Sequence, residues 1–209
     1  MDLTVFRRED RKYSGLWADG YSDANWDRLA KRVFTKLNSN GHRISLIDFG
    51  FGTGNAMDYF ERRGFYVEGT EISSHAVARQ LKRGRKVYHT SIDDLSSMQD
   101  KQFEVGFCND VIEHIPTELV APSLEEMARV CSDYLFVSVC PTPSNHLSLE
   151  GENLHLTIRP LSWWEDQFRN YGDVEKLRLL FSRSARYAIN LKSKTPSKTS
   201  PARLPLQNP

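Results

Sequence analysis

The sequence has few cysteines, no long apolar segment and almost no net charge, and each of these absences argues against a class of protein. Its three cysteines (Cys108, Cys131 and Cys140) are odd in number and far apart, which argues against a disulfide framework and a zinc motif. No apolar run approaches the roughly 20 residues that a membrane span needs. The charged N-terminal stretch lacks the apolar core of a secretory signal. We therefore expect a reduced, cytoplasmic protein with no membrane partner.

Charge is unevenly distributed along the chain. The formal net charge is +1, but from Arg183 onward the chain carries basic residues and no acid. The stretch "KSKTPSKTSPARLPLQNP" is rich in Pro, Ser and Lys, so it cannot bury enough apolar surface to offset its ordering entropy. We expect a helical cap or lid over residues 1–40, one folded domain over 41–191, and a disordered basic tail over 192–209.

Strand-like and helix-like segments alternate between Ile44 and Pro141. This alternation predicts a Rossmann-like, doubly wound α/β fold, with a mostly parallel seven-stranded sheet covered by helices on both faces. The expected strands are 43–49, 65–72, 86–92, 103–110, 134–141, 174–181 and 184–191, and the expected helices are 22–41, 53–64, 74–83, 116–131 and 159–172. In such a sheet, a ligand lies beyond the carboxyl ends of the strands, near the first turn from strand to helix.

Three glycines, Gly50, Gly52 and Gly54, occupy that turn in "LIDFGFGTG". Glycine permits tight dihedrals and lets a ligand approach bare peptide. The spacing G-x-G-x-G differs from the dinucleotide pattern G-x-G-x-x-G, because Asn55 stands where the third glycine of that pattern belongs. Glu71 ends the second strand, where a carboxylate suits two vicinal ribose hydroxyls. These residues favour a nucleoside ligand over a glycine-rich turn without a ligand.

The segments "LIDFGFGTG", "VEGTEIS" and "FCNDVIEHIP" together resemble the first, second and fourth motifs of class I S-adenosylmethionine (SAM)-dependent methyltransferases. The resemblance covers roughly residues 13 to 181 and implies SAM as the cofactor. The cofactor-binding residues that it implies are Tyr13, Asp48, Gly50, Phe51, Gly52, Gly54, Glu71, Ile72, Ser91, Ile92 and Asn109. Position 51 is often cysteine or a small residue in this family, so Phe51 narrows the loop.

The resemblance also implies which part of the cofactor each segment meets. The glycine loop lies along the methionine part, and Asp48 steadies the loop or meets the amino group. Glu71 holds the ribose hydroxyls, Ile72 lies against the adenine, and the segment around Ser91 and Ile92 meets the adenine edge. The backbone carbonyl of Asn109 lies near the cofactor amino group.

The stretch "NDVIEHIP", after the fourth expected strand, carries the candidate catalytic residues. Because SAM carries an activated methyl group, the protein mainly aligns a nucleophile, and a hydroxyl acceptor also needs a base. His114 is a candidate base, since the ordinary imidazole pKa is about 6.5; packing of the next helix is its alternative role. Glu113 is the second candidate, with structural hydrogen bonding as its alternative.

The loop after the fifth expected strand is where we expect the residues that contact the methyl acceptor. Its "HLTIRPLSWWEDQF" resembles the H-L-x(n)-W-x-x-x-F pattern of small-molecule and glycan-modifying members of the family. The resemblance implies a small-molecule or glycan acceptor, with His155 and Trp163 as candidate substrate residues and one tryptophan of the pair in the core. Tyr13, at the start of an aromatic stripe, is expected to contact the cofactor from a lid or to pack on the sheet.

Two other functions fit parts of the sequence. Asp110, Glu113, His114 and His155 resemble the E-x-x-E-H plus distant histidine set with which small-RNA 2′-O-methyltransferases bind a divalent metal. The F-x-P-P segment of those enzymes is absent, and the basic stretch "KRGRK" ends a helix, where cations are ordinary. We therefore expect no metal site and no nucleic-acid partner. A non-catalytic SAM-binding subunit is the other alternative.

Overall fold

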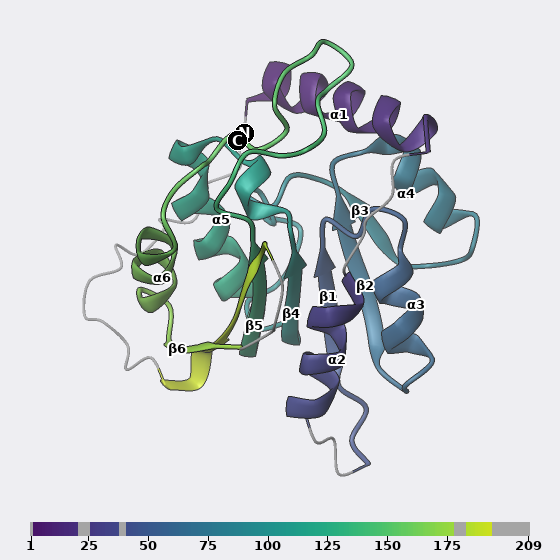
Figure 1. The fold of residues 1–209 in the computed structure, drawn as a ribbon. Coiled ribbons are helices and arrows are strands. Elements are labelled where there is room, and N and C mark those ends of the chain that lie inside the picture. Colours follow the sequence, from purple (N-terminus) through teal and green to yellow (C-terminus); the bar gives the residue numbers. More distant parts are fainter. Residues whose placement is uncertain (1, 21–25, 38–40, 178–182, 194–209) are drawn as a thin grey trace, which may run out of the picture.

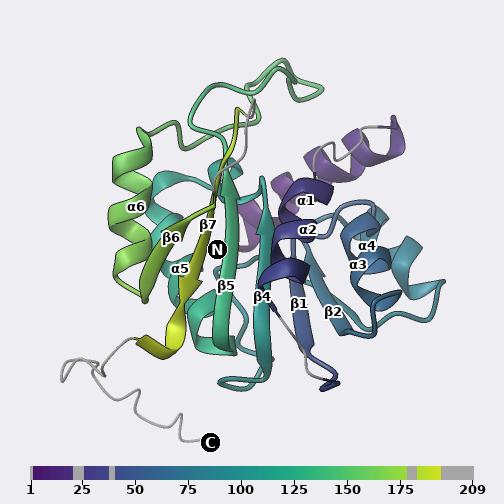
Figure 2. The ribbon, with the colours of Figure 1, turned by 60° about the horizontal axis from the view of Figure 1, so that its bottom comes forward.

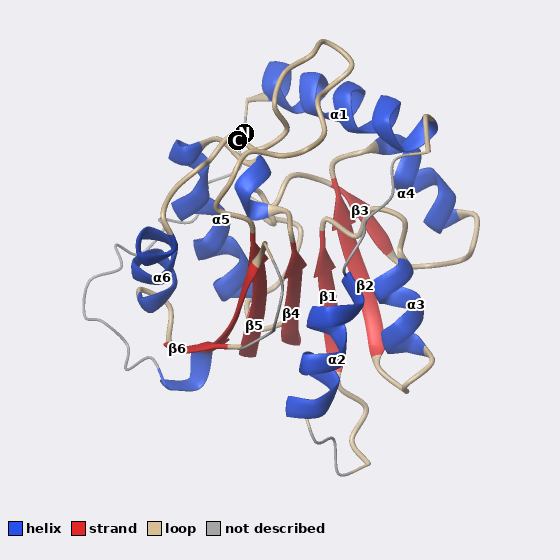
Figure 3. Cartoon of the chain, in the orientation of Figure 1, coloured by secondary structure: helices blue, strands red, loops and turns tan. Residues whose placement is uncertain are grey.

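The computed structural model describes residues 2–20, 26–37, 41–177 and 183–193. Figure 3 shows strands enclosed by helices. The helices are α1 (Leu3–Ala18), α2 (Trp26–Lys36), α3 (Asn55–Glu61), α4 (Ser74–Leu81), α5 (Thr117–Val130) and α6 (Leu161–Arg169), with short 3₁₀ helices η1 (Ile112–His114) and η2 (Leu191–Ser193). The strands are β1 (Ser45–Phe49), β2 (Tyr66–Glu71), β3 (Val87–His89), β4 (Phe103–Asn109), β5 (Cys131–Val139), β6 (Asp173–Lys176) and β7 (Ala185–Asn190).

The strands form one seven-stranded sheet in the order β3-β2-β1-β4-β5-β7-β6. Strands β1 to β5 pair in parallel, and β7 runs antiparallel to both β5 and β6. The sheet is therefore mixed and mostly parallel. The chain passes from β1 to β2 on one side and returns to β4 on the other, so the connections diverge above the carboxyl ends of β1 and β4. This switch point is where doubly wound sheets bind ligands, and α1 lies across the same edge (Figure 1).

Helices cover both faces of the sheet (Figure 2). Side chains of α2, α3 and α4 pack on one face, and those of α5 and α6 pack on the other. Strand β1 shows how the sequence sets this up, because successive side chains of a strand point to opposite faces. Leu46 packs with α2 and α3, whereas Ile47 and Phe49 pack with the α5 side.

The expected elements that lie within the described residues are present, and the differences concern their ends. The helix expected to reach residue 131 ends at Val130, and β5 begins at once with Cys131, since Phe103 of β4 pairs with Cys131. Lys192, the first residue of the expected tail, lies in η2, and its Nζ atom is 2.6 Å from Asp133 Oδ2. Residues 194–209 lie outside the described residues. No helix in the described part of the chain is long and apolar enough to cross a membrane.

The packing of α2 on the sheet predicts the effect of one core substitution. Leu29 on α2 is fully buried, so Leu29→Ala leaves a cavity and should lower the free energy of unfolding by about 2–5 kcal/mol. Leu81→Ala is the matched control, because Leu81 at the end of α4 is 55% exposed and should change stability by less than about 0.5 kcal/mol. Urea denaturation measures both variants. Equal stabilities would contradict the burial of α2 against the sheet.

Candidate active site

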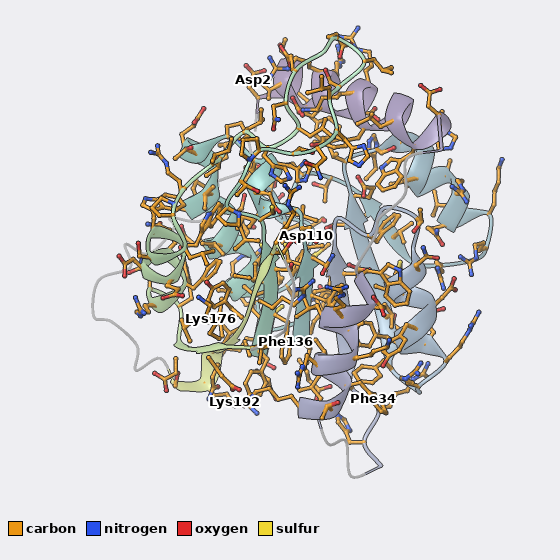
Figure 4. All side chains as sticks on the ribbon, viewed as in Figure 1. Asp2, Phe34, Asp110, Phe136, Lys176 and Lys192 are labelled. Atoms are coloured by element: carbon orange, nitrogen blue, oxygen red, sulfur yellow. The ribbon has the colours of Figure 1, made fainter. Side chains whose placement is uncertain are left out.

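A cavity of about 310 Å³ opens at the carboxyl edge of the sheet. Its walls come from the segments that follow β1, β2, β3, β4 and β5, and α1 supplies Glu9, Tyr13 and Trp17 from above. The labelled side chain of Asp110 marks this region in Figure 4, beyond the ends of β1 and β4. The volume is at the lower end of the roughly 300–1,000 Å³ of small-molecule pockets.

The glycine loop after β1 serves two different purposes. Gly50 and Gly52 line the cavity with φ of 72° and 52°, a left-handed region that favours glycine. A Cβ on Gly50 would lie 2.7 Å from Val111 Cγ2, so glycine lets this loop meet the segment after β4. Gly54 instead begins α3 and faces α4, since its Cβ would lie 2.5 Å from Gln80 Nε2.

Phe51 and Asp48 are buried at this loop but do not line the cavity. The Phe51 side chain is 2% exposed and packs in the core with α2 and α3, where a Cβ on Gly69 would lie 2.6 Å from Phe51 Cδ1. Asp48 is also buried, within β1. The resemblance places both residues near the cofactor, but the missing side chain of Gly69 leaves room for the Phe51 ring to turn toward the core.

The backbone N–H groups of the glycine loop donate to acceptors on β2. Gly50 and Phe51 both donate to the carbonyl of Thr70, at 2.8 and 3.2 Å. Gly52 donates to Glu71 Oε2 at 2.9 Å. These three groups are therefore not directed at a pyrophosphate, and the bare wall that the loop presents suits a ligand without phosphate.

Glu71 joins the glycine loop to the start of α4. Its Oε1 atom accepts from the N–H groups of Ile72 and Ser73, at 2.9 and 3.0 Å, while Oε2 accepts from Gly52. Burial raises the pKa of Glu71, although the backbone hydrogen bonds oppose that shift. Two carboxylate oxygens offer about four acceptor sites, so one remains for a ligand hydroxyl beside the three backbone donors.

The far end of the cavity is lined by the ends of β2 and β3. Ile72, Ser91 and Ile92 all contribute to its wall, as the sequence predicted for one side of a nucleoside base. Ser91 Oγ donates to Asp93, which fixes the turn that carries Ser91 and Ile92.

The segment after β4 places polar atoms in the cavity wall. Asp110 has φ of 52°, a conformation that Asp tolerates better than most residues. Its Oδ1 accepts from Ser138 Oγ at 2.5 Å and its Oδ2 from Asn109 Nδ2 at 3.3 Å. The Oδ1 atom of Asn109 is buried and has no hydrogen-bond partner in the described part of the chain.

Glu113 is fully buried and still lines the cavity. Its Oε1 accepts from the N–H of Cys140 at 2.9 Å, and its Oε2 has no hydrogen-bond partner among the residues described. Its peptide carbonyl accepts from Leu156 and Thr157, at 2.9 and 3.0 Å. Burial, and then the neighbouring charge of Asp110, raises the pKa of Glu113 well above its ordinary value.

His114 and His155 face each other across the cavity wall, with ring centroids 4.8 Å apart. The Nδ1 atom of His114 lies 3.0 Å from the Tyr13 hydroxyl on α1. Burial, and then the charge of His155, lowers the pKa of His114 to about 3. His114 is therefore neutral at physiological pH and a weaker base than the sequence suggested.

His155 lies beside Cys140 and is held by the loop after β5. Its Nδ1 donates to the carbonyl of Thr142 at 2.5 Å. A hydrogen bond with His155 lowers the pKa of Cys140 to about 7. Burial opposes protonation of His155, but its hydrogen bonds to Cys140 and Thr142 outweigh burial and raise the pKa of His155. Cys140 lines the cavity directly after the end of β5, and no sequence motif marks it as a site residue.

Trp163, the other expected substrate residue, is not in the cavity wall. It lies on α6, half-buried against the core, with its ring centroid 5.0 Å from that of Trp164. Trp164 is fully buried in the core, as expected for one tryptophan of the pair. Arg183, Asn145 and His146 line the cavity instead.

Helix α1 is fixed over the cavity by its contacts with α4. Asp10 Oδ1 accepts from the N–H of Ser74 at 2.8 Å, and Ser14 Oγ lies 2.9 Å from Ser73 Oγ. Glu9 and Lys12 form a buried ion pair on the same helix. These contacts bring Glu9, Tyr13 and Trp17 of α1 to the cavity wall.

A family model described as a methyltransferase domain matches residues 47–134. No curated protein matches this sequence. Among solved structures, magnesium protoporphyrin IX methyltransferase of Synechocystis with bound SAM has a TM-score of 0.64, at 15% identity, over 91% of this chain and 97% of that chain. The 1,6-didemethyltoxoflavin-N1-methyltransferase of Burkholderia thailandensis, with bound 1,6-didemethyltoxoflavin and S-adenosylhomocysteine, has a TM-score of 0.61, at 12% identity, over 90% of this chain and 84% of that chain.

At such identities a structural likeness shows the fold and leaves the reaction open. The [4+2]-cyclase SpnF illustrates this, with a TM-score of 0.54 at 19% identity, over 72% of this chain and 60% of that chain. The domain match is more specific, because residues 47–134 run from β1 into β5 and carry four of the five strand ends around the cavity. Residues 47–134 therefore match a methyltransferase domain, and the chain shares its fold with SAM-dependent methyltransferases of known structure.

Proposed function

We propose that this chain is a SAM-dependent methyltransferase that modifies a small-molecule or glycan acceptor, at a hydroxyl group. The observation that carries the proposal is that two unlike halves share one cavity. One half has the glycine loop, Glu71 and the apolar end at Ile72, and the other has the polar corner of Glu113 and His114. The first half suits a nucleoside carrying an amino acid, and the second suits a polar acceptor.

We assign the first half to SAM by the fit of its residues. Gly50 and Gly52 lie along the methionine part, and Glu71 accepts from a ribose hydroxyl while it braces the loop. Ile72, Ser91 and Ile92 enclose the adenine. Tyr13 closes this half from α1, and Asp48, Phe51 and Gly54 support the loop from the core side.

Asn109 is assigned to the amino group of the cofactor. Its Oδ1 atom is buried at the cavity without a partner among the described residues, and such an atom is costly to leave unsatisfied. An ammonium group has three donors and no acceptor. The amide oxygen of Asn109, and not the backbone carbonyl that the family resemblance implies, is therefore the proposed acceptor.

We assign Glu113, His114 and His155 to the acceptor. SAM supplies an activated methyl group when bound, so the main task of the chain is to hold the acceptor oxygen in line with it. His114 is neutral, and a neutral imidazole has one nitrogen that can accept a hydrogen bond from a hydroxyl. The enclosure of this corner by α1 and by the loop after β5 favours a small acceptor over a macromolecular chain.

Calorimetry of Glu71→Ala tests the cofactor assignment. Charged hydrogen bonds are worth about 1.5–3 kcal/mol each, so the affinity for SAM should fall at least tenfold. Glu68→Ala is the matched control, because Glu68 is a second buried carboxylate on β2 that bonds Tyr66, Lys86 and Tyr88 away from the cavity. SAM should bind the native chain and the control alike, and NAD should bind neither. Equal affinities for the two variants would mean that the ribose is held elsewhere.

The raised pKa of Glu71 predicts how SAM binding depends on pH. Burial favours the protonated carboxyl in the empty cavity, whereas the ionised form is the better acceptor for ribose hydroxyls. The affinity for SAM should therefore fall as the pH drops through the raised pKa of Glu71, which lies above the ordinary 4.5. Calorimetry at constant ionic strength measures this trend. A trend of the same size in Glu71→Ala would assign it to another group.

Methyl transfer itself is tested by incubating the full chain with labelled SAM and pools of hydroxylated metabolites and glycans. Label should appear in a small product, and His114→Ala, which removes the hydrogen-bond acceptor that orients the hydroxyl, should slow its formation by about 100-fold while SAM affinity is unchanged. His75→Ala is the control, since His75 is exposed on α4 and outside the cavity wall. SAM binding without transfer to any pool would instead support a non-catalytic SAM-binding subunit.

A further inference from the structure

Glu113, His114 and His155 bring three metal-ligating groups together at the acceptor end of the cavity. One ligand atom from each lies within 4.8 Å of the other two. Ligands bonded to one ion at about 2.0–2.2 Å lie about 3–3.5 Å from each other. Side-chain rotations that move these ligand atoms by about an ångström would therefore let all three bind one ion. The adjoining cavity leaves further coordination positions open.

The two imidazoles are held in the way that metal ligands are held. A metal-bound histidine usually engages its other ring nitrogen in a hydrogen bond that sets the ring orientation. Nδ1 of His155 donates to the carbonyl of Thr142, and Nδ1 of His114 lies 3.0 Å from the Tyr13 hydroxyl. Each ring also makes a second hydrogen bond, His114 with the Leu154 backbone and His155 with Cys140, and a bound ion would replace these contacts.

Glu113 supplies the carboxylate ligand, and one of its oxygens would be satisfied by a bound ion. Its Oε1 is occupied by the N–H of Cys140, while Oε2 is buried without a hydrogen-bond partner in the described part of the chain. A buried oxygen in that state is destabilising unless something satisfies it. The hydrogen bonds from Leu156 and Thr157 to the Glu113 carbonyl also fix the His155 loop against η1 before any ion arrives.

We propose that Glu113, His114 and His155 bind one divalent transition-metal ion, of the class of Zn²⁺, Mn²⁺ or Co²⁺. Two imidazoles with one carboxylate suit such ions, whereas Mg²⁺ and Ca²⁺ prefer all-oxygen sites. Asp110 is not part of the site, because its two oxygens accept from Ser138 and Asn109. This proposal replaces the sequence-based expectation of no metal, and it narrows the four residues considered there to three.

The role of the ion rests on the proposed function. An acceptor hydroxyl that takes an open coordination position has a lowered pKa. Its O–H bond breaks with the proton passing to water, and the oxygen electron pair forms the new C–O bond as the S–CH₃ bond of SAM breaks to leave S-adenosylhomocysteine. The ion would thus do what a weakly basic His114 does poorly.

The test is metal binding by the full chain after treatment with EDTA and removal of the chelator. Titration with Co²⁺, followed by calorimetry and by visible absorption, should show one ion per chain with nitrogen and oxygen ligands. Glu113→Gln and His155→Ala should each lower the affinity at least tenfold. Gln at position 113 keeps an acceptor for the Cys140 N–H, which preserves the fold. His42→Ala is the control, because it removes an exposed histidine 3.0 Å from Glu104 that could bind metal nonspecifically.

The same samples separate failure of this proposal from failure of the proposed function. SAM affinity is measured with and without EDTA and should not change, because the cofactor half is distinct from the three ligands. If SAM binds but Co²⁺ binds no more tightly to the native chain than to Glu113→Gln, the metal site is overturned and the methyltransferase assignment stands. Equal losses in His42→Ala and His155→Ala would also overturn it. Loss of SAM binding in both conditions would instead contradict the assignment of the cofactor half.

Discussion

Glu113 accepts a hydrogen bond from the Cys140 N–H inside the protein, and the arrangement of the polar corner depends on that contact. The side chain joins the segment after β4 to the end of β5, and its own carbonyl holds Leu156 and Thr157. One residue therefore sets the relative positions of three segments that line the cavity. A buried carboxylate is costly unless it is satisfied, so the corner is stable only if Glu113 finds its partners, and one of its oxygens still lacks one among the described residues.

Glu71 joins separate segments in the same way in the other half of the cavity. It accepts three backbone N–H groups, from the glycine loop and from the start of α4. The ends of β1 and β2 are thereby fixed to each other on one side of the switch point, while Glu113 fixes the ends of β4 and β5 on the other. The cavity thus lies between Glu71 and Glu113, two buried carboxylates that each hold backbone N–H groups of separate segments. These hydrogen bonds fix the loops that form the cavity wall.

Much of the fold and part of the site could be predicted because those features are local. Strand β1 and its glycine loop are encoded within a few residues, and the loop conformation requires glycine at positions 50 and 52. The positions of Phe51, Gly54 and Trp163 were harder to predict, because each depends on a partner in another element. Phe51 turns inward because Gly69 of β2 leaves room, Gly54 is small because Gln80 of α4 crowds it, and Trp163 is drawn to the core beside Trp164.

The sequence by itself determined the alternating elements, the mostly parallel α/β sheet and the residue types at the strand ends, since periodicity and turn chemistry act over short stretches of chain. Tertiary structure alone decided which of those residues meet. Tyr13 and His114 are 101 positions apart, yet they come within 3.0 Å because α1 packs on α4. His155 reaches His114 because Glu113 holds its loop. Such distances depend on how helices and loops pack on the finished sheet, and no local pattern in the chain specifies them.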